Sequence, residues 1–204
     1  LYMKTIELPY HSWVFPSAIK TEHIQEIDIP LPLKAVLIRR GLFTKENVNK
    51  FLNPDPLPDT KKHFPFLESA VDRLRKALEK KERIAICGDY DADGITSTVL
   101  LIEILNKLGA KAIPYIPSRQ DDGYGLNTKM INDIYNIEIR LVITVDNGIS
   151  AFDAIKKSIE LDIDLIITDH HKITKDNLNI YALIHPHKSP IDSPYKFLAG
   201  VGIA

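Results

Sequence analysis

Several features that mark whole classes of protein are missing from this sequence. It contains a single cysteine, Cys87, so an internal disulfide is excluded and a reducing cytoplasm is the expected location. No apolar run approaches the roughly 20 residues of a membrane-spanning helix, so no membrane association is expected. The N-terminus carries no signal-peptide pattern, and repeats and low-complexity tracts are absent from the sequence.

An excess of one charge is also lacking. The 204 residues include 26 Lys and Arg and 27 Asp and Glu, which gives a net charge of −1 with neutral histidines. This balance argues against a strongly basic nucleic-acid binder. It leaves room for a local basic groove, and metal ions bound in an acidic site would add positive charge that the count omits.

The organisation of the sequence changes near residue 66. Residues 1–66 are expected to form a small, mostly helical region, with an extended arm up to about residue 30 and short helices at 33–40 and 45–52. Residues 67–204 begin with a helical pattern and then alternate strands with helices. This alternation predicts an α/β domain with an open parallel sheet flanked by helices. The expected strands are 84–88, 111–116, 140–145, 164–168 and 180–184, and the expected helices between them are 95–108, 127–136 and 151–161.

Three short acidic clusters follow apolar runs that are typical of buried strands. They are residues 89–94 (DYDADG), 146–148 (DNG) and 169–171 (DHH). In an open parallel sheet all strands end along one edge, so these side chains should converge on one small volume. So many like charges rarely sit together without cations between them. The pattern therefore predicts a metal-dependent enzyme of phosphate chemistry.

The first cluster has carboxylates at every second residue. Asp89, Asp91 and Asp93 should point the same way from an extended loop, where Mg²⁺ or Mn²⁺ would bridge them. Thr96 and Ser97 then open a helix whose free N–H groups could hold a phosphate. The alternative is an acidic surface turn in which an aspartate caps the helix.

The other two clusters differ in how specifically they indicate a metal site. Asp169 and His170 mix a carboxylate oxygen with an imidazole nitrogen, a combination that suits Mn²⁺, Fe²⁺ or Zn²⁺. We expect these two residues to be ligands and His171 to be a phosphate donor or an orienting group. A solvent-exposed histidine pair is the alternative. Asp146 follows a strongly apolar strand, although the sequence Asp-Asn-Gly is also typical of a turn.

A glycine-containing loop follows the strand expected at 111–116. Arg119 could clamp a phosphate, and Tyr124, next to Gly125, could stack on a base. A loop held by a salt bridge is an equally good interpretation of these residues alone. His187, after the last expected strand, could add a phosphate contact. The basic run 73–83 contains interleaved acids and is expected to be a solvated helix face.

Taken together, these motifs resemble those of the RecJ family, the bacterial single-strand-specific 5′→3′ exonucleases of the DHH phosphoesterase superfamily. The resemblance covers roughly residues 30–204. It lies in residues 88–94, 117–119, 123–126, 144–148, 169–171 and 198–202. Members of this family are longer, and this chain starts with Leu1 and ends in an apolar run. We therefore expect a fragment that lacks a second lobe.

The resemblance also implies roles for individual residues. It implies a metal shell of Asp91, Asp93, Asp146 and His170, with Asp89, Asp169 and His171 close behind. Together with His171, the four shell residues would be catalytic. The chain departs from the family pattern at Cys87, where some members have histidine, at Asp122, usually glutamate, and at His185, usually asparagine.

The implied activity is hydrolysis of single-stranded DNA with two divalent ions, Mn²⁺ or Mg²⁺, releasing 5′-mononucleotides in DNA repair and recombination. The family further implies a monomer that works with single-stranded-DNA-binding protein and a RecQ-type helicase. The fragment alone is expected to have little or no activity. Two alternatives stay open: another hydrolase of the superfamily, acting on small phosphate esters, oligonucleotides or pyrophosphate, and a non-catalytic scaffold.

Overall fold

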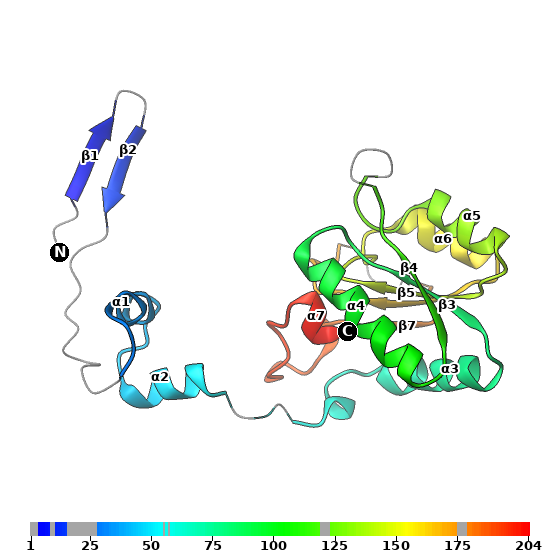
Figure 1. Ribbon diagram of the computed structural model, residues 1–204, viewed down its shortest axis with the longest axis horizontal. Coiled ribbons are helices and arrows are strands. Elements are labelled where there is room, and N and C mark those ends of the chain that lie inside the picture. Colours follow the sequence, from blue (N-terminus) through cyan, green and yellow to red (C-terminus); the bar gives the residue numbers. More distant parts are fainter. Residues whose placement is uncertain are drawn as a thin grey trace. The chain divides into compact units, whose positions relative to one another are not determined.

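The computed structural model describes residues 4–8, 11–15, 28–54, 56, 58–118, 123–174 and 179–204, with the first two segments described as backbone only. The chain divides into two compact units, residues 1–57 and 58–204. Figure 1 shows the elements of both units, which are described separately below. Within the described residues, no helix combines the length and apolar character that a membrane span requires.

The first unit contains a strand pair and two helices. Strands β1 (Lys4–Leu8) and β2 (His11–Phe15) pair antiparallel within the segment expected to be an extended arm. The bounds of helices α1 (Leu31–Arg39) and α2 (Lys45–Leu52) nearly match the two short helices predicted at 33–40 and 45–52. The Thr44 side chain caps α2 by accepting a hydrogen bond from the Asn47 N–H. A small core of Leu37, Ile38 and Val48 holds the two helices together.

The second unit is built on a parallel five-stranded sheet of order β4-β3-β5-β6-β7. This confirms the predicted fold class. The strands are β3 (Arg83–Cys87), β4 (Lys111–Tyr115), β5 (Leu141–Val145), β6 (Asp164–Thr168) and β7 (Ala182–Ile184). The helices are α3 (Leu67–Glu79), α4 (Ala92–Lys107), α5 (Thr128–Asn136), α6 (Phe152–Glu160) and the short α7 (Gly200–Ile203).

Helices cover both faces of this sheet. Ile84 and Ile86 of β3 pack into the core that includes residues of α3 and α4, while Ala85 and Cys87 pack into the core under α5 and α6. Side chains alternate between the faces of a strand, so a strand buried on both faces must be apolar throughout. Short 3₁₀ helices at Thr60–Lys62 and Pro186–Lys188 complete the unit. Phe64 also packs into its core, against the ring of Tyr195.

One residue of the basic run is not solvated. Arg73 of α3 is only 8% exposed, and its guanidinium contacts two acids. Nη2 lies 2.7 Å from Glu82 Oε2 and Nε lies 2.5 Å from Asp164 Oδ2. A buried arginine needs such partners, because the desolvated charge is otherwise very unfavourable. Arg73 therefore ties α3 to the first residue of β6, and the expectation of a fully solvated face was wrong at this position.

Candidate metal centre at the sheet edge

The three acidic clusters meet at one edge of the sheet. Strands β3, β5 and β6 are neighbours; β5 and β6 end immediately before a cluster, and β3 ends one residue, Gly88, before the first cluster. The backbone continues the pairing beyond the strands, since the Asp146 N–H donates to the Thr168 carbonyl and the Asp169 N–H donates to the Ile184 carbonyl. Five aspartates and two histidines from distant parts of the sequence thus lie at the same edge, as the strand-end rule predicts.

A tight turn places Asp146 at the centre of this edge. Asp146 has φ of +61°, in the left-handed region that aspartate and asparagine tolerate better than most side chains. The backbone of α7 approaches it closely, because a Cβ on Gly200 would lie 2.6 Å from Asp146 Cβ. Only glycine fits at position 200 without displacing this carboxylate. The turn and α7 together fix the position of the Asp146 side chain.

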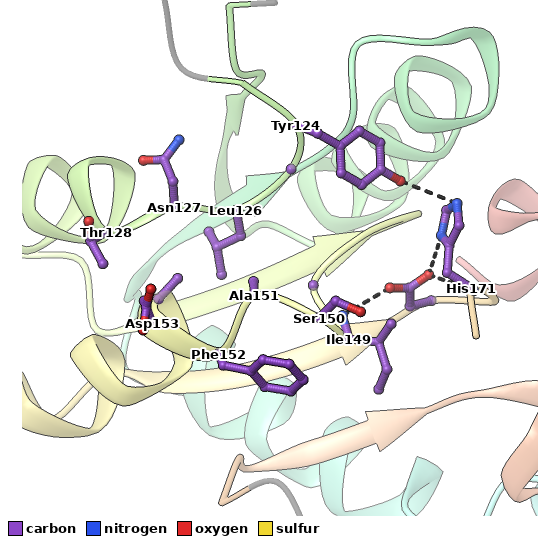
Figure 2. A pocket seen from close by; sticks show the side chains of 14 residues that line it. Tyr124, Leu126, Asn127, Thr128, Ile149, Ser150, Ala151, Phe152, Asp153 and His171 are labelled. Atoms are coloured by element: carbon purple, nitrogen blue, oxygen red, sulfur yellow. Dashed lines mark hydrogen bonds and ion pairs between the residues drawn. The ribbon is translucent and has the colours of Figure 1, made fainter. Parts of the chain in front are cut away.

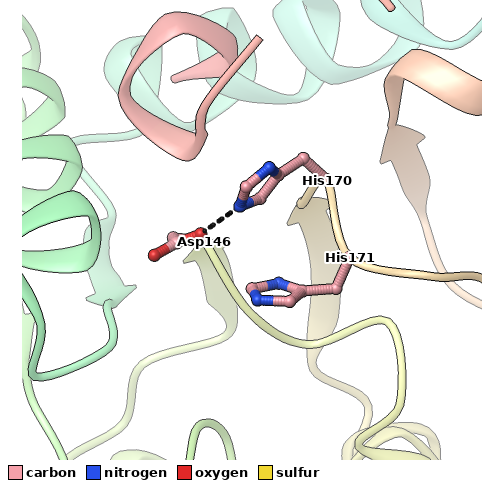
Figure 3. A group of neighbouring side chains, drawn as sticks. All are labelled: Asp146, His170 and His171. Atoms are coloured by element: carbon pink, nitrogen blue, oxygen red, sulfur yellow. Dashed lines mark ion pairs between the residues drawn. The ribbon is translucent and has the colours of Figure 1, made fainter. Parts of the chain in front are cut away.

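Two groups of side chains at the edge could each hold a metal ion. One comprises Asp146, His170 and His171 (Figure 3), and the other comprises Asp89, Asp91 and Asp146. In each group one donor atom per residue lies within 4.8 Å of the others. Asp146 belongs to both groups. This arrangement is suited to two ions that share one bridging carboxylate.

The electrostatics of the edge favour bound cations. Asp89 Oδ1 and Asp146 Oδ1 are buried and have no hydrogen-bond partner. His170 Nε2 lies 3.0 Å from Asp146 Oδ1, but the contact lacks hydrogen-bond geometry. Burial and the nearby Asp93 charge raise the pKa of Asp146 to about 6, and burial likewise raises the pKa of Asp89. Unpaired buried oxygens beside imidazole nitrogens fit a divalent ion such as Mn²⁺.

Two other carboxylates are already held by backbone N–H groups. Asp91 Oδ1 accepts from the N–H groups of Asp93 and Gly94 at 2.9 and 3.0 Å and so caps α4, which begins at Ala92 instead of the predicted residue 95. The Asp93 carboxylate accepts from the N–H groups of Gly200 and Val201 at 2.7 and 2.8 Å. Its Oδ2 also lies 3.7 Å from His170 Nε2.

Asp169 is engaged in a different way. It is 1% exposed, and its Oδ1 accepts from the backbone N–H groups of His170 and His171 at 2.7 and 3.0 Å. The same oxygen lies 2.8 Å from His171 Nδ1, and Oδ2 accepts from the Ile149 N–H at 3.0 Å. Asp169 is in neither donor group among the described residues. Burial alone would lower the pKa of His171, but the hydrogen bond and charge of Asp169 outweigh it and raise that pKa.

The residues predicted to contact substrate are spread more widely. Thr96 and Ser97 donate their hydroxyls to backbone carbonyls of α4, and Ser97 is fully buried. His187 donates its N–H to the buried His185 Nδ1. Arg119 lies outside the described residues. Tyr124 Oη lies 3.2 Å from His171 Nε2, so this residue does reach the metal groups.

Three further side chains, those of Asn147, His185 and Cys87, complete the surroundings. Asn147 is buried beside Asp146, and its contacts reach Cys87 and Leu126. His185 is fully buried and lies with Nε2 2.8 Å from the His171 carbonyl oxygen; burial lowers its pKa, which favours the neutral ring. These contacts join residues far apart in sequence, so the sequence pointed to the two side chains but not to their partners. Burial raises the pKa of the Cys87 thiol, and Cys87 is in neither donor group.

A pocket of about 560 Å³ opens beside the metal groups, between the starts of α5 and α6 (Figure 2). Its walls are partly apolar, with Leu126, Ile149 and Phe152, and partly polar, with Asn127 and Ser150. Its lining also includes Tyr124, Asp169 and His171. The pocket is therefore continuous with the candidate metal centre.

Known proteins of the family that the motifs resemble match this chain. Residues 83–204 match the model of the DHH family, N-terminal domain. The chain is 38% identical over 184 residues to the single-stranded-DNA-specific exonuclease RecJ of Bacillus subtilis, a match covering 88% of this chain and 23% of that protein. It is 40% identical over 140 residues to RecJ of Escherichia coli, covering 68% of this chain and 24% of that protein.

A solved structure matches as well. The crystal structure of RecJ in complex with Mn²⁺ from Thermus thermophilus shares 30% identity with a TM-score of 0.63, covering 83% of this chain and 23% of that chain. The present chain spans about a quarter of the length of the curated relatives it matches. The resemblance to RecJ that the motifs indicated is confirmed, and the chain belongs to the DHH family.

Proposed function

We propose that this chain is the catalytic core of a RecJ-type exonuclease, which removes 5′-mononucleotides from single-stranded DNA with two divalent ions, Mn²⁺ or Mg²⁺. The observation that carries the proposal is the pair of donor groups sharing the buried Asp146. The relatives are named as single-stranded-DNA-specific exonucleases, and one of them was crystallised with Mn²⁺. A role in DNA repair and recombination, with single-stranded-DNA-binding protein and a RecQ-type helicase as partners, follows from the resemblance alone.

The residues divide the work by position. Asp89 and Asp91 would hold one ion, His170 the other, and Asp146 would bridge the two. When bound, such a pair of ions makes water a stronger nucleophile and stabilises charge on the attacking and leaving oxygens. Asp93, held by the N–H groups at the start of α7, limits the movement of His170.

His171 has a separate task. Its Nδ1 is bound to Asp169, so the ring presents its other nitrogen, Nε2, to Tyr124 Oη at 3.2 Å, at the edge of the metal groups. The raised pKa favours the cationic ring, which is suited to neutralising a phosphoryl oxygen as negative charge develops. The pocket beside it offers room for part of the nucleotide next to the scissile bond.

The test compares substrates and measures metal binding in parallel. The 204-residue chain, and any longer protein that contains it, would be incubated with Mn²⁺ and 5′-labelled single-stranded DNA, a blunt duplex, dinucleotides or pyrophosphate. We expect mononucleotide release from the single strand by a longer protein that contains the chain, little or none from the 204 residues alone, and loss of the release in Asp146→Asn. The matched control is Asp162→Asn, since Asp162 is exposed and also has a positive φ, of +53°.

The outcomes separate the proposal from its rivals. Faster turnover of pyrophosphate or dinucleotides than of single-stranded DNA would identify a small-substrate hydrolase. Calorimetry decides the other case: Mn²⁺ binding that Asp146→Asn abolishes, without turnover in any protein containing the chain, would identify a non-catalytic scaffold. Equal Mn²⁺ binding by both variants would contradict the metal centre itself.

A further inference from the structure

A chain of hydrogen bonds joins three of the sequence motifs. Asp169 Oδ1 lies 2.8 Å from His171 Nδ1, and His171 Nε2 lies 3.2 Å from Tyr124 Oη. The other oxygen of Asp169 accepts from the Ile149 N–H, next to the Asp-Asn-Gly turn. Figure 2 shows Tyr124 and His171 facing one another at the rim of the pocket. The loop after β4 thus contacts the loop after β6 through the side chains of Tyr124 and His171.

The bonding fixes which atom of His171 faces Tyr124. Asp169 Oδ1 accepts from two backbone N–H groups and acts as an acceptor toward His171 as well, so His171 Nδ1 is the donor. The ring therefore presents Nε2 to the tyrosine hydroxyl. That hydroxyl can donate to an unprotonated Nε2. When Nε2 carries a proton, the hydroxyl can accept from it and donate to the Asp146 carbonyl oxygen 3.5 Å away.

Tyr124 needs support from its own loop to make this contact. Tyr124 is 56% exposed, so packing around the ring alone does not fix the side chain. The ring does contact that of Tyr90 edge to face, with 6.3 Å between the ring centroids. The support comes from Asn147, whose Oδ1 accepts from the Leu126 N–H at 3.0 Å. Gly125 has φ of +67°, and a Cβ there would lie 3.3 Å from Asn147 Cβ. The loop therefore lies directly against Asn147.

Asn147 is itself rigidly held. It is 1% exposed, and its amide donates to the carbonyl oxygens of Cys87 at 3.0 Å and Val145 at 2.9 Å. These carbonyls belong to the last residues of β3 and β5. Asn147 thus connects the ends of two core strands to the loop that carries Tyr124. A buried amide with three hydrogen bonds is a stiff connection, because breaking any one of them leaves a buried polar group unpaired.

We propose that Tyr124 is a positioning residue that orients His171 through its hydroxyl, and that Asn147 holds the loop of Tyr124 in place for this purpose. The inference rests on the proposed function for its kinetic consequence, but the orientation itself can be measured without turnover. It differs from a stacking role for Tyr124, in which the ring is needed and the hydroxyl is not.

The kinetic test uses this difference. Tyr124→Phe keeps the ring and removes the hydroxyl, whereas Tyr124→Ala removes both. Loss of a group that orients a catalytic residue typically costs about 10- to 100-fold in activity. We expect Tyr124→Phe to lower kcat by that factor with little change in KM. A wild-type kcat in Tyr124→Phe combined with a raised KM in Tyr124→Ala would overturn the proposal in favour of stacking.

A spectroscopic test addresses the orientation directly in the metal-free 204-residue chain. Long-range ¹H–¹⁵N spectra report the protonation and bonding of both His171 ring nitrogens. We expect Tyr124→Phe to shift the Nε2 resonance and to leave the proton on Nδ1. The control is Tyr181→Phe, because Tyr181 is partly exposed and precedes β7, at the opposite end of the sheet.

The same spectra test the role of Asn147 and separate the two proposals. Asn147→Ala should move the His171 Nε2 resonance in the same direction as Tyr124→Phe, since it releases the loop. An unchanged His171 spectrum in Tyr124→Phe would refute the positioning role, whatever the activity. If the spectra change as expected but no protein containing the chain hydrolyses DNA, the orientation stands and the proposed function fails.

Discussion

Replacing Asp146 with asparagine should stabilise the metal-free protein. Asp146 is 2% exposed, and its Oδ1 has no hydrogen bond. The substitution removes a buried charge and keeps the shape of the side chain. It also suits the backbone, because asparagine tolerates the left-handed conformation with φ of +61°. Aspartate at this position therefore carries a cost in stability that a bound cation would offset.

The magnitude follows from the raised pKa. A carboxyl group whose pKa rises from 3.8 to about 6 holds its proton more tightly in the folded chain by about 3 kcal/mol. Well below pH 3.8 the group is protonated in both states and this difference disappears. Between pH 3.8 and about 6 the unfolded chain loses its proton first, so the free energy of unfolding falls, and the full loss is present above pH 6. The asparagine amide is itself a buried polar group and loses part of this gain, so we expect about 1–3 kcal/mol for the variant at pH 7.5.

Urea unfolding followed by circular dichroism measures this directly. In EDTA, Asp146→Asn should be the more stable protein at pH 7.5 and close to wild type at pH 4. With Mn²⁺ at about 100 times its dissociation constant, the free energy of unfolding of the wild type should rise by about 2.7 kcal/mol and that of the variant by much less. The difference in stability between the two proteins should therefore shrink or change sign. Asp162→Asn controls for the amide itself. A variant less stable than wild type in EDTA at pH 7.5 would refute the reasoning.

Three other substitutions test separate parts of the structure. Arg73→Ala should lower the free energy of unfolding, measured in urea, by about 2–4 kcal/mol, because Asp164 and Glu82 lose a buried partner. The control Arg75→Ala, which removes an exposed ion pair, should change it by less than about 1 kcal/mol. Gly200→Ala should weaken Mn²⁺ binding in calorimetry by about tenfold or more, because the added Cβ displaces Asp146, which belongs to both donor groups. Unchanged affinity would show that α7 moves away and leaves Asp146 in place. Asn147→Ala should lower the free energy of unfolding, measured in urea, by about 2–4 kcal/mol, since it removes the partner of three backbone groups. A decrease of less than about 0.5 kcal/mol would show that water replaces the amide.

Much of the fold was predictable because its signals are local. The apolar runs 141–145 and 165–167 are buried on both faces of the sheet, which is why they lack polar alternation. Convergence of the acidic clusters follows from parallel strands alone. The start of α4 was missed by three residues, because Asp91 was interpreted as a possible ligand when its Oδ1 also caps the helix. Capping and ligation use the same side chain, and spacing does not distinguish them.

The detailed geometry of the site depends on contacts that spacing cannot reveal. Asp146 and Asp169 both follow buried strands and are similar in sequence context, yet only Asp146 belongs to the donor groups. Both oxygens of Asp169 accept from backbone N–H groups, Oδ2 from that of Ile149, 20 residues before Asp169. In the same way, Ser97 points into the protein because of where α4 begins. Its assignment as a phosphate contact stays a prediction, as does that of the other proposed site residues.

The hydrogen bonds of the edge sort its carboxylates into two kinds. Asp93 and Asp169 have both oxygens bound to N–H donors, so the fold itself stabilises their charges. Asp89 and Asp146 each keep a buried oxygen without a partner, and burial raises the pKa of both. A buried acceptor without a donor is costly, so these two oxygens favour an external cation as the missing partner. Metal binding should therefore change the environment of Asp89 and Asp146 most and that of Asp169 least.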